Sequence, residues 1–164
     1  MRAPVRLWLE VSHHQAFRVG GWAFVRFDGK GVTGFAGGER QVDAERICLA
    51  GLAAVLGDLA PGASVELLTS SAGVLAIPRR ISAAESGENP PAHNLDLWAQ
   101  ASTALRRASV AVRRVEQEPR SASAFAAAWS DFARDRAKDK GAFKAPIPKA
   151  NLAKSGALSP QSEG

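Results

Sequence analysis

Alternating apolar and polar positions over the first 40 residues predict three consecutive strands. Val5, Leu7 and Leu9 recur at every second position, the period of a strand with one buried face. Two similar runs follow, and residues 28–31 (Asp-Gly-Lys-Gly) between them suit a hairpin turn, because glycine accepts the positive φ that such turns need. The pattern predicts an antiparallel meander. Its strands are expected at residues 5–11, 21–27 and 32–36.

Beyond residue 40 the pattern alternates between helices and strands. Apolar spacing predicts a helix over 42–59, with Asp43 as its N-cap. Strands at 65–68 and 110–115 are each reached through a helical segment, so both should run parallel to the first strand. A short helix stopped by Pro78 is expected near residues 73–81, a loop at 82–93, and helices at 94–109 and 122–138. The chain is therefore expected to be an α/β protein, with a five-stranded mixed sheet flanked by helices.

Composition limits the classes of protein to consider. The 164 residues are 46% hydrophobic, enough for one domain with a real core. No apolar run approaches the roughly 20 residues that span a bilayer, so no membrane partner is expected. A single cysteine, Cys48, excludes an internal disulfide and a cysteine zinc cluster. The N-terminus leads into a strand rather than a signal peptide, which makes the cytoplasm the expected location.

The net charge of +5 is concentrated near the C-terminus. Residues 134–154 hold seven basic and two acidic side chains, which together equal the net charge of the whole chain. Periodicity is lost after Gly141, so we expect a domain over residues 1–140 and a basic, disordered tail over 141–164. Such a tail could contact nucleic acid, solubilise the protein, or dock on a protein partner through Phe143, Ile147 and Leu152. The lysines considered for nucleic-acid contact are Lys138, Lys140, Lys144 and Lys149.

Short segments, in order along residues 4–134, carry a resemblance to a known family. Residues 20–23 (Gly-Gly-Trp-Ala) and 46–49 (Arg-Ile-Cys-Leu) resemble the family's Gly-Gly-aromatic-small and Arg-x-Glu-Leu motifs. Residues 69–71 (Thr-Ser-Ser) resemble Thr-Asp-Ser, and 94–98 (Asn-Leu-Asp-Leu-Trp) resemble Asn-x-Asp-Leu-Trp. Residues 132–134 (Phe-Ala-Arg) resemble the Leu-Ala-Arg of its last helix. The family is type 1 ribonuclease H, and the resemblance implies a ribonuclease H-like fold.

The same resemblance points to a degenerate active site. The family hydrolyses RNA in RNA–DNA hybrids with carboxylates around two magnesium ions. The first carboxylate position falls on Glu10, and the others fall on Cys48, Ser70 and, depending on helix register, Ala128 or Ser130. A serine hydroxyl cannot replace a carboxylate as a hard anionic ligand for magnesium.

Three functions follow as alternatives. The leading one is a pseudoenzyme, a catalytically inactive binding or scaffolding module without a cofactor, whose protein partner the sequence does not identify. A second is a magnesium-dependent ribonuclease H with a relocated carboxylate set on Glu10, Glu45 and Asp131. A third is a non-catalytic binder of RNA or RNA–DNA hybrid that uses the basic tail and the faces formed by the arginine pairs at 79–80, 106–107 and 113–114. In every case Glu10 and Ser70 should lie at adjacent strand ends, with Cys48 facing them from its helix.

Overall fold

A six-stranded mixed sheet forms the centre of the protein, in a computed structural model that describes residues 4–157. The strand order is β5-β4-β1-β2-β3-β6. The strands are β1 (Val5–His14), β2 (Val19–Phe27), β3 (Val32–Arg40), β4 (Ser64–Thr69), β5 (Ser109–Arg114) and β6 (Phe143–Pro146). As the sequence predicts, β1, β2 and β3 are antiparallel neighbours, and β4 and β5 are parallel to β1.

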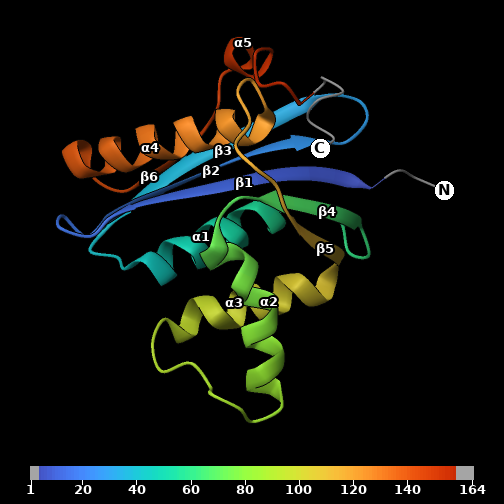
Figure 1. The fold of residues 1–164 in the computed structure, drawn as a ribbon, viewed down its shortest axis with the longest axis vertical. Helices are drawn as coiled ribbons and strands as arrows, with labels where there is room; N and C mark the ends of the chain where they lie inside the picture. Colours follow the sequence, from blue (N-terminus) through green and yellow to red (C-terminus); the bar gives the residue numbers. More distant parts are fainter. Residues whose placement is uncertain (1–3, 158–164) are drawn as a thin grey trace.

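Helices cover both faces of the sheet (Figure 1). On one face lie α1 (Ala44–Leu56), α2 (Ala72–Glu85) and α3 (Leu95–Arg107), and on the other α4 (Ala122–Lys140) and the short α5 (Lys149–Leu152). Asp43 caps α1 as predicted, its side chain accepting from Arg46 N. Each face has its own core, because alternate strand side chains point to opposite faces. Leu7 and Leu9 belong to the α1 side, and Trp8 to the α4 side.

Small residues let α4 pack directly on the sheet. A Cβ added at Gly21 would lie 2.2 Å from the Ser130 carbonyl oxygen, and one at Gly38 would lie 2.6 Å from that of Ala133. The buried side of α4 is made only of alanine and serine. Its aromatic residues lie elsewhere on the helix, and Phe132 is 52% exposed. Close backbone approach to the glycines of β2 and β3 therefore determines which face of α4 is buried.

The segment after Gly141 is part of the folded unit, which corrects the expectation of a disordered tail. Strand β6 pairs with β3 in antiparallel fashion and gives the sheet its sixth strand. Ile147 and Leu152 are buried against the α4-side core. Prolines interrupt the periodicity of this segment without preventing these contacts, so the domain continues past residue 140. The tail prediction for residues 158–164 lies outside the described residues.

The second correction concerns α2, which runs to Glu85 instead of ending at Pro78. Ser71 caps the helix by accepting from Val74 N, and Val74 and Ile77 are buried. Proline removes one backbone donor and tends to kink a helix, and here the packing of Val74 and Ile77 maintains the helix across it. None of the helices within residues 4–157 is long and apolar enough to cross a membrane.

Candidate functional site

Strands β1 and β4 bring Glu10 and Ser70 together. Trp8 lies opposite Leu68 in the parallel β1–β4 ladder, so Ser70, just beyond the end of β4, comes to lie beside Glu10. The expectation that Glu10 lies at a strand end is wrong, because it lies inside β1, which continues four residues further to His14. Glu10 is two residues after Trp8 in the same strand, so its side chain lies on the same face of the sheet and points toward α4.

The Glu10 carboxylate is surrounded by neutral donors. Ser70 donates to it twice, from Oγ at 2.6 Å and from the backbone N–H at 2.9 Å. Ser123, in the first turn of α4, donates from Oγ at 2.7 Å. Gln117 in turn donates to Ser70 Oγ at 2.8 Å. We call Glu10, Ser70, Gln117 and Ser123 the Glu10 cluster.

Burial sets the protonation chemistry of this cluster. Only 2% of Glu10 is exposed. Burial raises the pKa of the Glu10 carboxyl above its ordinary value, because loss of hydration disfavours the charged form. Hydrogen bonds from Ser70 and Ser123 act in the opposite direction and only partly offset that increase. The cluster therefore stabilises an isolated buried carboxyl with hydroxyl and amide groups.

This donor set does not fit the pair of magnesium ions that the resemblance implies. Magnesium takes about six oxygen ligands and loses its water reluctantly. Both carboxylate oxygens of Glu10 already accept protein hydrogen bonds, and the Ser70 and Ser123 hydroxyls direct their hydrogens at Glu10. Across residues 4–157, no group of three or more His, Cys, Asp or Glu side chains is placed to hold a metal.

The fourth position of the resemblance does not lie at Glu10. Ala128 is exposed on α4. Ser130 is buried where α4 crosses Gly21, and its hydroxyl donates to the Ala127 carbonyl at 2.7 Å. Ser123, which the sequence did not indicate, is the α4 residue that contacts Glu10.

Cys48 lies on the α1 side of the sheet. It is buried in the core, and its Sγ is 4.0 Å from the Ser71 hydroxyl, next to Ser70 in the chain. Glu10 points to the opposite face, so the expectation that Cys48 faces Glu10 and Ser70 is wrong, and Cys48 does not join the Glu10 cluster. Burial raises the pKa of the Cys48 thiol, which disfavours the reactive thiolate. The residue is a core thiol facing a small recess of about 260 Å³ beside Trp98.

The carboxylates of the relocated set are not brought together. Glu45, on α1, accepts from Arg80, Asn94 and the Trp98 indole. Partial burial opposes ionisation of Glu45, but these hydrogen bonds outweigh it and lower its pKa. Asp131 is exposed on α4 and pairs with Arg134 at 3.5 Å. Glu45 and Glu10 contact helices on opposite faces of the sheet, and each carboxylate has a separate set of partners.

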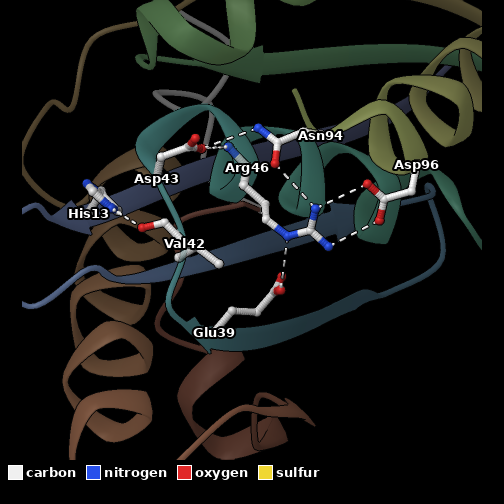
Figure 2. A network of polar contacts seen from close by, with 7 residues as sticks. All are labelled: His13, Glu39, Val42, Asp43, Arg46, Asn94 and Asp96. Atoms are coloured by element: carbon white, nitrogen blue, oxygen red, sulfur yellow. Dashed lines mark hydrogen bonds and ion pairs between the residues drawn. The ribbon is translucent and has the colours of Figure 1, made fainter. Parts of the chain in front are cut away.

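A second polar cluster joins the starts of α1 and α3 (Figure 2). Arg46 donates to both Asp96 carboxylate oxygens at 3.2 Å and to Asn94 Oδ1 at 3.3 Å. Glu39 Oε1 is 4.0 Å from Arg46 Nε, and Asn94 also donates to Asp43 at 3.4 Å. The hydrogen bond from Arg46 is the main reason that the pKa of Asp96 is lowered. We call these five residues the Arg46 cluster; they unite two of the segments that carry the resemblance.

The candidate nucleic-acid-binding lysines lie on ordered elements. Lys138 and Lys140 are on the last turn of α4, Lys144 is on β6 and Lys149 begins α5. All four are exposed. Lys138 lies 3.6 Å from the Phe17 ring centroid, and Lys144 lies 5.4 Å from that of Phe35. Ile147 and Leu152, considered as partner contacts, are buried within this protein.

Comparison with solved structures identifies the fold. No profile of a known protein family and no curated protein matches the chain. LC9-RNase H1, a type 1 RNase H with the type 2 active-site motif, is similar with a TM-score of 0.67 and 14% identity, over 94% of this chain and 86% of that one. The N-terminal RNase H domain of Rv2228c from Mycobacterium tuberculosis, solved as a fusion with maltose binding protein, has a TM-score of 0.55 and 17% identity, over 83% and 96% of the two chains. The chain therefore has the ribonuclease H fold.

Proposed function

We propose that this protein is a binding or scaffolding module that uses the ribonuclease H fold without two-metal hydrolysis. One observation carries the proposal: Glu10, the remaining carboxylate of the expected set, is buried and occupied by Ser70 and Ser123. Two-metal hydrolysis needs anionic ligands that hold two cations against the reacting phosphate. A carboxyl whose oxygens are already hydrogen-bonded to neutral neighbours does not supply them.

The surroundings of the Arg46 cluster support the same proposal. Its single arginine is surrounded by the carboxylates Glu39, Asp43 and Asp96. A phosphodiester backbone would meet more negative than positive charge there. The charge of this part of the surface therefore does not favour binding of a hybrid there.

The decisive experiment is cleavage of a labelled RNA–DNA hybrid in millimolar magnesium and, separately, manganese. A catalytically competent type 1 ribonuclease H serves as the positive control. We expect no product above the rate without protein. Cleavage that requires a divalent cation and is abolished by Glu10→Gln would overturn the proposal and indicate an active, metal-dependent ribonuclease H.

Nucleic-acid binding is the second candidate function, because exposed lysines lie on α4 and on β6, both of which contact β3. Such binding would neutralise phosphates and weaken steeply with salt. Truncation after Gly141 is unsuitable as a test, since it removes the buried residues Ile147 and Leu152. The double substitution Lys138→Glu with Lys144→Glu, compared with Lys30→Glu in the β2–β3 turn, tests it in a salt titration with labelled RNA. Binding that is equally sensitive to both sets of substitutions would exclude this surface.

A further inference from the structure

The two edges of the sheet differ in how they are closed. At one edge, β6 has four residues, ends at Pro146 and is followed by Pro148. Proline removes backbone donors and blocks further pairing. At the other edge, β5 is outermost in the strand order and contains no proline (Figure 1). Its residues are exposed or half-buried.

The ladder defines which β5 backbone groups face outward. The N–H groups of Ser109 and Val115 donate to the carbonyls of Ala63 and Thr69 on the β4 side. Because the pattern alternates along a parallel pair, the backbone groups of Val110, Val112 and Arg114 point away from β4. These residues present a row of strand donors and acceptors at the open edge.

A recess lies beside this edge, on the face of the sheet that α2 and α3 cover. It has a volume of about 440 Å³, opens to the surface, and is lined by residues of α2, α3 and β5. Leu75, Leu105, Val110 and Val112 provide apolar walls. A strand added to β5 would place every second side chain on the same face as Val110 and Val112, above this recess.

Arginines determine which charge on a bound segment would be favourable at this edge and recess. Arg79, Glu85 and Arg106 line the recess, and Arg114 lies on the same face of β5 as Val112. Glu85 pairs with Arg106 and Glu116 with Arg114, while exposed Arg79 has no ion pair within residues 4–157. A second copy of the chain would bring the same arginines to this edge, whereas an acidic segment would complement them.

We propose that β5 is a docking edge for an extended acidic peptide that adds as a seventh strand and inserts apolar side chains into the α2–α3 recess. Backbone hydrogen bonds would supply affinity, and the recess and Arg79 would supply selectivity. The inference rests on the proposed binding role and names its surface. It does not depend on the loss of hydrolysis, so the hybrid-cleavage assay and the peptide assay can fail separately.

Fluorescence anisotropy with a labelled peptide of alternating valine and aspartate tests the proposal. Val112→Pro removes an outward N–H without touching the β4 ladder, and should weaken binding at least about tenfold, a loss of about 1.4 kcal/mol. Val112→Ala, which retains the N–H, separates the backbone effect from the side-chain effect and should bind more tightly than Val112→Pro. Arg79→Glu should also weaken binding, whereas Lys30→Glu, with the same charge change in the β2–β3 turn, should not.

Hydrogen exchange gives a direct readout in the unaltered protein. Saturating peptide should protect the amides of Val110, Val112 and Arg114, and should leave those of Ala111 and Arg113 unchanged. Equal binding by a peptide whose backbone nitrogens are methylated would show charge attraction without strand addition and overturn the proposal. Absence of saturable binding, or dimerisation of the free protein that Val112→Pro abolishes, would overturn it as well.

Discussion

The Glu10 and Arg46 clusters contain similar numbers of hydrogen bonds in opposite environments. The Glu10 cluster has a single ionisable group, buried to 2% exposure and satisfied by neutral donors. The Arg46 cluster joins opposite charges at the surface, where the Arg46 and Asp96 side chains are 30% and 60% exposed. Water competes for most contacts in the second cluster, whereas in the first it competes mainly for the exposed contact between Gln117 and the half-buried Ser70. Burial, more than the number of contacts, should therefore determine what each cluster contributes to stability.

The largest effect is expected from Glu10→Ala. It leaves the buried Ser123 hydroxyl and the half-buried Ser70 donors without an acceptor. A buried donor without a partner costs roughly 1–3 kcal/mol, so we expect a loss of about 3 kcal/mol in the free energy of unfolding. Urea denaturation measures this loss. The matched control is Glu66→Ala, which removes a half-exposed carboxylate paired with Arg6 and Arg113 and should cost at most about 1 kcal/mol. Equal losses for the two variants would contradict the claim that burial determines how much each carboxylate contributes to stability.

A smaller effect should appear in the pH dependence of stability. The pKa of Glu10 is raised in the folded protein, so the folded state binds more protons than the unfolded state between the ordinary value and the raised one. Stability from this group is then full below the ordinary pKa and falls as pH rises through the folded value. As the pH rises through that window, the free energy of unfolding of the native protein should fall relative to that of Glu10→Gln. A change in the other direction would contradict the conclusion that burial outweighs hydrogen bonding in setting the pKa of Glu10.

The smallest effect is expected from Arg46→Ala. Its partners are solvated, and exposed ion pairs contribute below about 1 kcal/mol. Salt should reduce even this loss, because screening weakens exposed pairs. Urea denaturation at low and high sodium chloride, beside Glu10→Ala as the salt-insensitive reference, provides the measurement. An Arg46→Ala loss as large as that of Glu10→Ala would show that the Arg46 cluster is a buried interaction in solution.

The sequence predicted those parts of the site that depend on strand and cap patterns. The resemblance to ribonuclease H, together with the strand pattern, placed Glu10 beside Ser70, and Asp43 was identifiable as an N-cap from its residue type and position. Ser123 could not be found in this way. The apolar pattern of α4 is dominated by Phe125, Trp129 and Phe132, yet the buried face follows the small residues that approach Gly21 and Gly38.

Strand β6 was missed for a related reason. Its register is specified by pairing with β3 and by the burial of Ile147 and Leu152, contacts between segments more than 100 residues apart. Local periodicity does not predict contacts between distant segments, and Pro146 and Pro148 by themselves indicate a loop. The α2 boundary differs similarly, because Val74 and Ile77 pack well enough to keep Pro78 inside the helix.

The most direct test of the central claim is the effect of magnesium on unfolding, measured for the native protein and for Ser70→Asp. A cation that binds only the folded state must raise the free energy of unfolding. Millimolar magnesium should leave the native protein unchanged, because its carboxylate is already occupied by hydroxyl and amide donors. Ser70→Asp should be destabilised by the second carboxylate beside Glu10, and magnesium should recover part of that loss. Stabilisation of the native protein by magnesium, abolished by Glu10→Gln, would contradict the account.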